Sequence, residues 1–389
     1  MQTPGPLNVL FYHAQFFVGS ETFIYQQAIN PHVRPLLLAK RFVSSGPLVT
    51  DGFTCFTYKR TRWDGAVSNL LALAGVDRYY LRGSINRLRQ LLAAQRIDVI
   101  HAQFGFNAVR ILPLAKLLQI PLVVSFHGLD ASKLLRRRSY RNGLREVFDY
   151  ASAIVVCNPA MAQALPLTEQ QQQKVHWIPY GINLQHFSGE RAAKRGASPL
   201  NVLHVGRFVE KKGVPDLIRA FADVNRVNKE VVLHLVGNGP QEAEVRALVD
   251  RFHLGESVVF HGWKSPEEVK RLMAQADLFV LNSRVASDGD SEGLPVGLLE
   301  AMAMSLPVVS TRHAGIPLEV ESGVSGLLVA EKDTSALSGA MLELLSHETQ
   351  RLAFGRAARL RVEAQFTMEA MHQALLRCYQ AAAEAGPDL

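Results

Sequence analysis

Two glutamates eight positions apart, Glu292 and Glu300, are the side chains whose type and spacing most suggest chemistry. Glu292 lies in a loop rich in Gly, Asp and Ser, whereas Glu300 lies in a run of Ala, Leu and Met that predicts a helix. Pro295 suits the first position of that helix, because its missing N–H would have no partner there. A helix start favours an anion through its free N–H groups and dipole. The N–H groups concerned lie near Leu294, Val296 and Gly297. A ligand with a negative middle and hydroxyls at both ends, such as a sugar nucleotide, fits this geometry.

A basic pair follows an earlier predicted strand. Arg207 comes directly after the strand that ends near Gly206, and Lys212 follows five residues later. Ligands of open α/β sheets bind at the carboxyl ends of the strands. An Arg and a Lys that converge on a diphosphate stabilise the charge that develops as a nucleotide leaves. A lone basic pair is usually surface charge, but its place after a strand favours the binding role.

Three further residues are candidates for the binding site because each follows a predicted strand. His127 follows the predicted strand Pro121–Phe126, although a lone histidine there is more often structural. Gly19 lies in the loop after the first predicted strand, where the missing Cβ would let backbone approach a phosphate. Trp263 follows Gly262 and would either stack near a base or belong to the core or a lid.

Short apolar runs alternate with helical stretches along the whole chain. Most of these runs do not alternate with polar residues, as expected for strands covered on both faces. The predicted strands are Asn8–Tyr12, Pro35–Ala39, Phe53–Tyr58, Asp98–Ala102, Pro121–Phe126, Ala153–Cys157, His176–Ile178, Asn201–Val205, Val231–Val236, Val258–Phe260, Leu278–Leu281, Pro307–Ser310 and Gly326–Val329. This alternation predicts an α/β protein with parallel sheets and helices on both faces.

Several motifs in a fixed order resemble those of the retaining glycosyltransferases of family 4, which have the GT-B fold. They are Glu292-x7-Glu300 with the following Ala-Met-Ala-Met304, Gly19-Ser-Glu-Thr-Phe-Ile24, Phe126-His-Gly-Leu-Asp130, Ile178-Pro-Tyr-Gly-Ile182, His204-Val-Gly-Arg-Phe-Val-Glu-Lys-Lys-Gly213, Leu235-Val-Gly-Asn-Gly-Pro240 and Gly323-Val-Ser-Gly-Leu-Leu-Val329. The resemblance spans nearly the whole chain. It is strongest to the exopolysaccharide transferases of the colanic acid or amylovoran type, which share Ser20-Glu-Thr-Phe-Ile24 and His101-Ala-Gln-Phe-Gly105.

The resemblance implies two facing Rossmann-like domains and a role for each candidate. Glu292 and His127 would lie at the reacting centre, with Glu292 on hydroxyls of the donor sugar and His127 at its 6-position or steadying the transition state. Glu300 would bind the nucleotide ribose. The full donor-binding set would be Gly19, Arg207, Lys212, Gly237, Trp263, Leu294, Val296, Gly297 and Glu300. Arg207 and Lys212 would replace the metal of other glycosyltransferases, so we expect neither a metal nor a cofactor.

The chain departs from the family pattern at two acidic positions, one of which is Asn183 in place of the usual Asp, and carries one misleading motif. The usual Gly-Gly-Ile-Pro-Glu segment of the family reads Ala314-Gly-Ile-Pro-Leu-Glu319 here. The glutamate comes one residue later than in the family, so the resemblance assigns Glu319 no role. Asp288-Gly-Asp290 resembles a metal-binding motif of a different glycosyltransferase fold. Its position before Glu292 instead matches the exopolysaccharide subset, which makes metal binding the less favoured interpretation.

The 389 residues suit two domains. We expect an acceptor-binding domain over 1–185, a nucleotide-sugar-binding domain over 186–366 and a returning C-terminal helix over 367–389. The sequence shows no secretory signal and no apolar run of the roughly 20 residues that span a bilayer. Three cysteines without metal-ligand spacing favour reduced thiols and a cytoplasmic protein.

Charge is divided unevenly between the two halves. Residues 1–185 hold 20 Lys and Arg against 9 Asp and Glu, a net charge of +11 within a total of +7. Ile85, Leu88, Leu91 and Leu92 recur at helical spacing among arginines, which predicts a basic amphipathic helix. Its arginines would either face solvent or attract anionic lipid headgroups. Aromatic residues do not interleave with the basic clusters, so nucleic acid is the less favoured partner.

The sequence therefore predicts a retaining, metal-independent transferase that moves a hexose from a UDP- or GDP-linked sugar to a glycan acceptor. The expected acceptor is lipid-linked, and the enzyme would be cytoplasmic with peripheral membrane contact. Two alternatives stay open. One is a sugar-nucleotide epimerase with the same fold, and the other is a non-catalytic protein that binds membranes or polyanions through its basic half.

Overall fold

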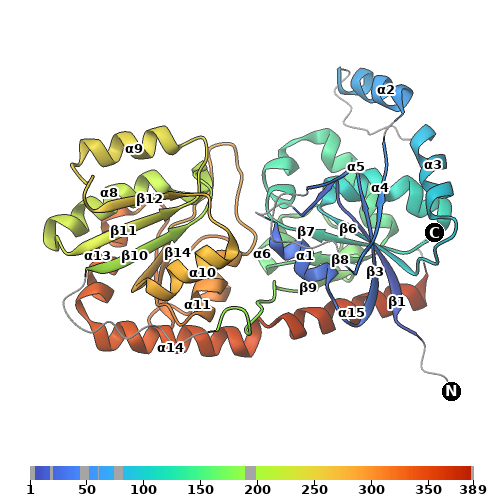
Figure 1. Ribbon diagram of the computed structural model, residues 1–389. Helices are drawn as coiled ribbons and strands as arrows, with labels where there is room; N and C mark the ends of the chain where they lie inside the picture. Colours follow the sequence, from blue (N-terminus) through green and yellow to red (C-terminus); the bar gives the residue numbers. More distant parts are fainter. Residues whose placement is uncertain are drawn as a thin grey trace. The chain divides into compact units, whose positions relative to one another are not determined.

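The computed structural model describes residues 5–17, 21–43, 52–59, 61–73, 82–188 and 199–386. The chain forms two compact units, one made of Met1–Gly181 with Glu369–Leu389 and the other of Ile182–Met368. We call them unit 1 and unit 2, and Figure 1 shows their elements. Which unit binds donor and which binds acceptor stays a prediction.

Unit 1 is built on a seven-stranded parallel sheet with the order β5-β3-β1-β6-β7-β8-β9. Its strands are β1 (Leu7–Tyr12), β3 (Val33–Ala39), β5 (Thr54–Thr57), β6 (Val99–Gln103), β7 (Leu122–Phe126), β8 (Ala151–Val156) and β9 (Val175–Trp177), beside a small sheet of β2 (Gln15–Phe16) and β4 (Arg41–Phe42). The strands β6 and β7 are buried throughout, as their unbroken apolar character predicts.

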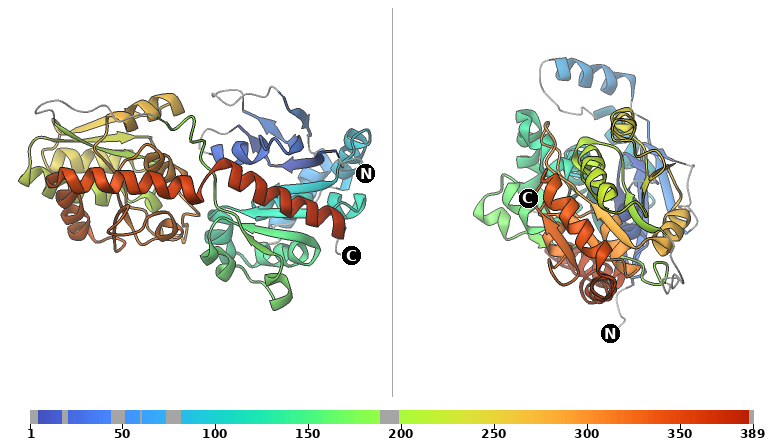
Figure 2. Two further views of the ribbon diagram at one scale, coloured as in Figure 1. Left: turned by 90° about the horizontal axis from the view of Figure 1, so that it is seen from below. Right: turned by 90° about the vertical axis from the view of Figure 1, so that its left-hand side faces the viewer.

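Helices flank this sheet, and one of them comes from the far end of the chain. They are α1 (Thr22–Ala28), α2 (Arg62–Leu73), α3 (Arg82–Leu92), α4 (Gly105–Leu118), α5 (Arg138–Tyr150), α6 (Pro159–Ala164), α7 (Glu169–Gln172) and α15 (Met368–Ala385), with short 3-10 helices η1 (Leu129–Ala131) and η2 (Lys133–Arg136). Helix α15 lies along the unit 1 sheet (Figures 1 and 2), where Leu375 and Tyr379 join the core around Val9 and Phe11. The Tyr379 hydroxyl also bonds His101 Nδ1 at 2.7 Å.

Unit 2 repeats the plan with a six-stranded parallel sheet of order β12-β11-β10-β13-β14-β15. Its strands are β10 (Leu200–Val205), β11 (Val231–Val236), β12 (Val258–Gly262), β13 (Leu278–Leu281), β14 (Val308–Thr311) and β15 (Gly326–Val329). Its helices are α8 (Val214–Val227), α9 (Glu242–Arg251), α10 (Pro266–Gln275), α11 (Val296–Ala303), α12 (Ile316–Glu319), α13 (Thr334–Ser346) and α14 (Glu348–Gln365), with the 3-10 helix η3 (Glu210–Lys212).

Local sequence explains where these helices begin. Ser265 caps α10 by accepting from the N–H of Glu268, whose carboxylate accepts from the N–H of Ser265, and Pro266 occupies the first turn. Helix α8 begins after Gly213, whose φ of 63° lies in the left-handed region. A Cβ at Gly213 would also lie 2.5 Å from the carbonyl oxygen of Asn282, so the close approach of these two loops requires glycine.

Each sheet has a point where the strand order reverses. In unit 2 the chain runs from β10 outward to β11 and β12, and then returns to the other side of β10 as β13. In unit 1 the reversal lies between β1 and β6. Ligands of open α/β sheets bind outside the carboxyl ends of the strands at such a reversal. The topology therefore places one candidate site in each unit.

Candidate functional site

In unit 2 the loops after β10 and β13 flank the reversal point and carry most of the predicted donor-site residues. The loop after β10 holds Arg207 and Lys212, and the loop after β13 holds Glu292 and leads into α11. A Cβ on Gly297, in the first turn of α11, would lie 3.9 Å from the carbonyl oxygen of Val205 at the end of β10. The start of α11 is thus close to the carboxyl end of β10, as an anion site at this edge requires.

The structure corrects the predicted start of this helix by one residue. Helix α11 begins at Val296, and Pro295 is its N-cap with an extended backbone (φ −75°, ψ 101°) rather than its first helical residue. No side chain caps α11 among the described residues. The N–H groups of Val296 and Gly297 therefore keep the orientation that favours an anion, while Leu294 is buried just before them.

Lys212 and Glu292 form a close ion pair. The Lys212 Nζ lies 2.7 Å from Glu292 Oε1, and both side chains are largely buried. Burial by itself would raise the pKa of Glu292, but the ammonium groups of Lys212 and Lys211 outweigh it and hold that pKa at about 2. Glu292 is therefore a carboxylate at neutral pH. It is paired with Lys212, the cation predicted to bind the diphosphate.

A buried histidine fixes the backbone of Glu292. The N–H of Glu292 donates to His313 Nε2 at 3.1 Å, and His313 Nδ1 lies 2.7 Å from Glu331 Oε1. Because the Glu331 carboxylate only accepts, the His313 proton is on Nδ1 and Nε2 is free to accept. Sequence reasoning missed His313 and Glu331, although His313 follows the end of β14 and its position there was a usable signal.

Lys211, the neighbour of Lys212, is held by the Asp-Gly-Asp segment. Its Nζ lies 3.2 Å from Asp290 Oδ1, and the N–H of Asp290 donates to Asp288 Oδ1 at 2.9 Å. In the described part of the chain, no three His, Cys, Asp or Glu residues are grouped as metal ligands. Asp290 thus orients Lys211 beside the site. Lys211 Nζ also lies 3.9 Å from Glu292 Oε2, so Lys212 is the nearer of two lysines that face Glu292.

Arg207 and Trp263 stand at the same edge of the sheet with their side chains in solvent. Arg207 is exposed directly after β10, and its guanidinium has no ion-pair partner among the residues that the structure describes. Trp263 is 57% exposed after the end of β12. A free guanidinium can take a phosphate, and an exposed indole can stack on a base. Both roles stay predictions.

Glu300 lies on α11 and is half-buried. Burial raises the pKa of Glu300 to about 8. Over the described ranges, neither a hydrogen bond nor an ion pair engages its side chain. An unpaired carboxyl one turn and a half into the helix can accept hydrogen bonds from two neighbouring hydroxyls, as the predicted ribose contact requires.

Glu319 is a further acid near this site to which the sequence assigned no role. It ends α12 and is fully buried, and neither carboxyl oxygen has a hydrogen-bond partner in the described structure. Burial raises its pKa well above the ordinary value, the negative charge of Glu292 adds to this, and Lys212 opposes it. The protonated form of Glu319 is therefore favoured, and Glu319 lies within electrostatic reach of the Lys212–Glu292 pair.

Close packing of two loops explains why the predicted donor-site residue 237 is a glycine. Its φ is 124°, and a Cβ there would lie 2.0 Å from the carbonyl oxygen of Gly206. The loops after β10 and β11 can approach this closely only because residue 237 is glycine. Gly237 thus sets the course of the backbone that carries Arg207.

In unit 1, His127 lies just after β7 with both ring nitrogens engaged. Its Nε2 is 2.8 Å from Gln103 Oε1, and its Nδ1 is 2.7 Å from the Tyr180 hydroxyl. The Gln103 oxygen only accepts, so Nε2 carries the proton and Tyr180 donates to Nδ1. Burial lowers the pKa of His127 well below its usual value, and His101 and His13 add to the effect. The ring is neutral, and a sugar contact would have to replace one of these bonds.

The backbone around His127 is fixed by Asp130. Its Oδ1 accepts from the N–H groups of His127 (2.9 Å) and Gly128 (3.1 Å), and its Oδ2 accepts from Gly105 at 2.9 Å. Burial raises the pKa of Asp130 to about 6, although these N–H groups favour its ionised form. Asp130 thereby ties the loop after β7 to the start of α4.

A second polar cluster lies at the unit 1 reversal point. His13 Nε2 is 3.0 Å from Glu21 Oε2, and His13 Nδ1 accepts from Asn107 Nδ2 at 2.9 Å. The predicted phosphate-contacting residue Gly19, between His13 and Glu21 in the sequence, lies outside the described residues. The sequence feature that could have identified His13 as a site residue is its position directly after β1.

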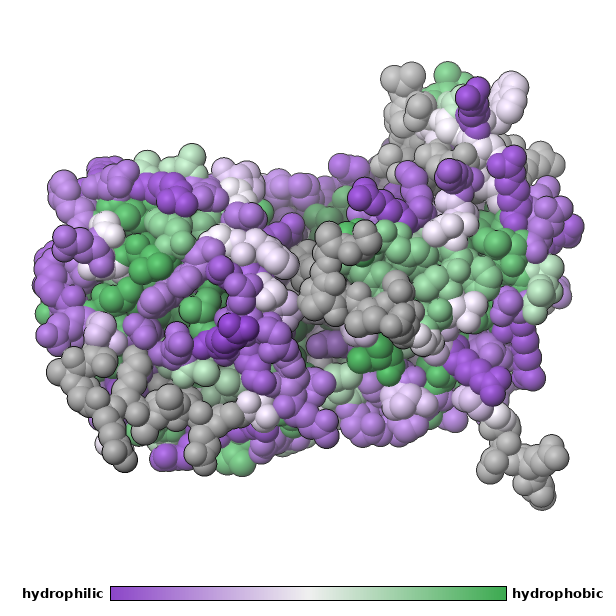
Figure 3. Space-filling view, viewed as in Figure 1, coloured by the Kyte–Doolittle hydropathy of each residue, from purple (hydrophilic) through white to green (hydrophobic). Residues whose placement is uncertain are grey.

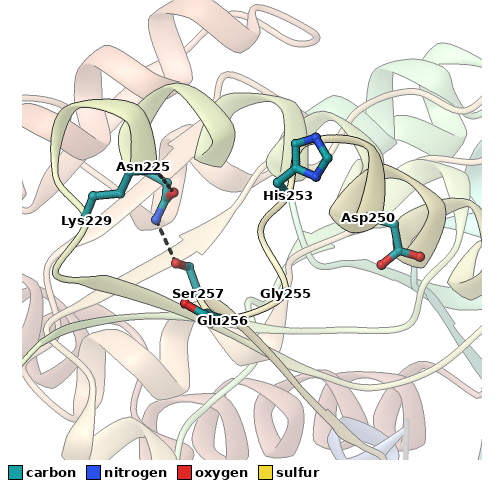
Figure 4. A pocket seen from close by; sticks show the side chains of 7 residues that line it. All are labelled: Asn225, Lys229, Asp250, His253, Gly255, Glu256 and Ser257. Carbon is teal, nitrogen blue, oxygen red and sulfur yellow. Dashed lines mark hydrogen bonds between the residues drawn. The ribbon is translucent and has the colours of Figure 1, made fainter.

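A separate pocket in unit 2 lies away from all predicted site residues. It encloses about 610 Å³ and is lined by Asn225, Lys229, His253, Ser257 and their neighbours (Figure 4). Lys229 precedes β11 and Ser257 precedes β12, so the pocket lies at the amino ends of the strands. Its residues take no part in the site at the carboxyl ends.

Two parallel-sheet, Rossmann-like units, with the Glu292–Lys212 constellation at the reversal point of the second, define a glycosyltransferase of the GT-B fold. Residues 190–361 match the family described as glycosyl transferases group 1, and residues 55–186 match glycosyltransferase family 4. The chain belongs to the family 4 glycosyltransferases.

Named relatives and a solved structure agree with this assignment. The chain is 32% identical to WcaL of Escherichia coli strain K12, named as a colanic acid biosynthesis glycosyltransferase, over 96% of this chain and 100% of WcaL. It is 32% identical to the amylovoran biosynthesis glycosyltransferase AmsK of Erwinia amylovora, over 77% of this chain and 75% of AmsK. The structure of Anabaena HepE with UDP and glucose superposes with a TM-score of 0.76 at 19% identity, covering 95% of this chain and 98% of HepE.

Proposed function

We propose that this protein transfers a hexose, with retention of the anomeric configuration, from a nucleoside diphosphate sugar to a lipid-linked glycan during surface polysaccharide synthesis. The observation that carries the proposal is the cationic edge of unit 2, where Arg207 is exposed and Lys212 is paired with a carboxylate that a diphosphate can displace. The relatives named for colanic acid and amylovoran synthesis support the polysaccharide part. A UDP-bound HepE supports a nucleotide donor.

Donor binding, in this proposal, exchanges partners around Lys212. The diphosphate takes the Lys212 ammonium and the Arg207 guanidinium, and the α11 N–H groups bind a second phosphate oxygen. Glu292, released from Lys212, accepts hydrogen bonds from sugar hydroxyls, and Glu300 accepts from the ribose. The positive charge comes from side chains and the helix start, so the proposed reaction needs neither a metal nor a cofactor.

The proposed chemistry is a same-face displacement. The bond from the anomeric carbon to the phosphate oxygen breaks, and a bond to the acceptor hydroxyl oxygen forms on the same side. The proton of that hydroxyl passes to the departing phosphate oxygen. Arg207 and Lys212 stabilise the charge on this oxygen, which is the largest contribution that preorganised groups make to such a step.

The acceptor is proposed to be lipid-linked and reached at the cytoplasmic face of a membrane. Residues 1–185 carry a net charge of +11, which favours contact with anionic headgroups. Four arginines of η2 and α5 are exposed to solvent, namely Arg136, Arg137, Arg138 and Arg145. None of the helices that the structure describes is both long and apolar enough to cross a bilayer.

A thermal-shift panel of nucleotide sugars tests the donor site. A donor at a hundredfold excess over its Kd should stabilise the wild type by about 2.7 kcal/mol, with and without chelator. The Arg207→Ala variant should show a much smaller shift with the same donor. A shift that disappears with chelator would refute metal independence, and a full shift in the variant would refute the assigned role of Arg207.

The reaction itself is tested by product analysis. Proton NMR of the product glycan should show the anomeric configuration of the donor. A product with the inverted configuration would refute retention. Isomerised donor formed without any acceptor would refute transfer and identify an epimerase.

A further inference from the structure

Helix α2 turns two large apolar side chains to solvent and two polar side chains to the protein. Trp63 and Leu70 are 80% and 68% exposed, whereas Asp64 and Ser68 are 1% and 9% exposed. Residues seven apart lie on one face of a helix, and residues four apart lie on another. Among the α2 side chains that the structure describes, this polar pair is thus turned inward and this apolar pair outward, which is the reverse of an ordinary surface helix.

Specific hydrogen bonds hold α2 in this orientation. The Asp64 carboxylate accepts from the N–H of Ser84 at 2.8 Å and also from the Ser84 hydroxyl. The Ser84 Oγ in turn accepts from the N–H of Thr61 at 3.3 Å, and Thr61 Oγ1 accepts from the N–H of Asp64 at 3.1 Å. Turning Trp63 inward would break these bonds and leave a buried carboxylate unpaired, so the outward apolar face is built into the fold.

The neighbouring helix α3 shows the ordinary arrangement. Leu88 and Leu92 are 2% and 3% exposed, and the arginines Arg87 and Arg89 face solvent. The predicted basic amphipathic helix therefore packs its leucines in the protein, except for Leu91, which is 40% exposed. Leu88 and Leu92 of α3 are thus buried in the protein, whereas Trp63 and Leu70 of α2 are exposed.

Helix α2 lies at the outer edge of unit 1 in Figure 1, next to α3, to which its Asp64 is hydrogen-bonded. Hydrophobic residues are among those at the surface of this part of unit 1 in Figure 3. The exposed indole of α2 is of the kind that concentrates at membrane–water interfaces. Exposed arginines accompany it, one at the start of α2 (Arg62) and two on α3 (Arg87 and Arg89). An apolar face beside basic residues matches the boundary between acyl chains and anionic headgroups.

We propose that α2 is a membrane-docking helix that inserts Trp63 and Leu70 into the interface of an anionic bilayer, with arginines of α2 and α3 on the headgroups. The inference rests on the proposed lipid-linked acceptor, because docking would bring the enzyme to the surface where such an acceptor lies. This proposal assigns the apolar membrane contact to α2, whereas the sequence predicted membrane contact only through the basic helix, which is α3.

Co-sedimentation of the full chain with vesicles tests this docking. Binding to vesicles with 30 mol% phosphatidylglycerol should fall by at least about tenfold in the double variant Trp63→Gln/Leu70→Gln, as expected for losing two buried apolar side chains. The matched control is Leu117→Gln, a 47% exposed leucine on α4, which should bind as the wild type does. Arg87→Gln/Arg89→Gln should weaken binding roughly fivefold per arginine at low salt. Wild-type binding by the Trp63/Leu70 variant would overturn the proposal.

Insertion depth is read from the indole. Vesicles that carry brominated acyl chains should quench part of the wild-type tryptophan fluorescence, and the Trp63→Phe variant should bind but lose that quenching. Equal quenching in both proteins would overturn the proposal. A dimer seen in sedimentation velocity without lipid and abolished in Trp63→Gln/Leu70→Gln would also overturn it, because a second copy would then cover α2.

The donor thermal shift separates this inference from the proposed function. The Trp63/Leu70 variant should keep the full shift with the donor, since α2 holds no predicted donor residue. Loss of vesicle binding with an unchanged donor shift supports docking by α2. Absence of a donor shift in the wild type refutes the proposed function while vesicle binding still decides the docking inference.

Discussion

Lys212 Nζ lies 2.7 Å from Glu292 Oε1, so the side chain predicted to bind the diphosphate is paired with the side chain predicted to bind the sugar. In the proposed function the diphosphate binds Lys212, so it competes with Glu292 for this ammonium. Lys211 Nζ, 3.9 Å from Glu292 Oε2, is a second cation for the carboxylate.

Glu292→Gln should bind the free nucleoside diphosphate more tightly than the wild type does. Removing the carboxylate charge frees Lys212, which should improve affinity about fivefold, while transfer should fall at least about a hundredfold because sugar hydroxyls lose their acceptor. Isothermal titration and a transfer assay measure the two effects. Asp290→Asn is the control, since it removes a charge that pairs with Lys211 instead. Weaker binding by Glu292→Gln would show that Lys212 does not hold the phosphate.

Affinity for a nucleotide sugar should rise with pH through the titration of Glu300. The pKa of Glu300 is raised to about 8 by burial, and the ionised form is the better acceptor for ribose hydroxyls. The ionised fraction, and with it the affinity, should increase by up to about tenfold between pH 7 and pH 9. Titrations of wild type and Glu300→Gln across this range give the comparison. A rise of the same size in the variant would assign the effect to another group.

The buried acid Glu319 should make the fold less stable at alkaline pH. Its pKa is raised in the folded state, so the folded protein binds more protons than the unfolded chain above the ordinary carboxyl pKa. The stabilisation is complete below that value and is lost as the pH rises toward the folded pKa. Glu319→Gln removes this titration, so the free energy of unfolding of the variant should fall less between pH 6 and pH 9 than that of the wild type.

Urea denaturation at pH 6 and pH 9 measures this difference. Glu321→Gln is a matched control, because Glu321 is exposed two residues further along the chain. If Glu319→Gln and the wild type lose stability equally between the two pH values, Glu319 is not the group responsible.

Gly237→Ala should destabilise unit 2 and disturb the donor site together. The added Cβ would lie 2.0 Å from the Gly206 carbonyl oxygen at a φ of 124°, so the loop that carries Arg207 has to move. We expect a loss of about 2 kcal/mol or more and a weaker donor shift. The control Gly255→Ala adds a Cβ with nothing within 4 Å and should leave both unchanged. Wild-type behaviour of Gly237→Ala would mean that the two loops are not tightly packed.

Much of the fold followed from the sequence because buried parallel strands are unbroken apolar runs. Val231–Val236, Leu278–Leu281 and Gly326–Val329 have the predicted bounds, and the other predicted strands differ by one or two residues at an end. Strand ends are less certain because pairing with a neighbour, and not local preference, decides where a ladder stops. Helix α11 began one residue later than predicted, since Pro295 is extended and caps the helix.

The site itself depended on contacts that no local pattern contains. The pairing of Glu292 with Lys212, and of its backbone with His313, joins loops that follow three different strands. Glu319 was set aside because it is shifted by one position from the family pattern, yet α12 buries it near that pair.

The sequence by itself determined the GT-B class and the family, because apolar periodicity and the order of motifs are properties of the chain. Only the tertiary structure decided which charges neutralise each other and which helix face meets solvent. Helix α2 shows this clearly: its composition suits either orientation, and the bonds from Asp64 to Ser84, twenty positions away, turn Trp63 outward. Side-chain partners are fixed by the strands and loops that packing brings together, and that information is not local to any segment.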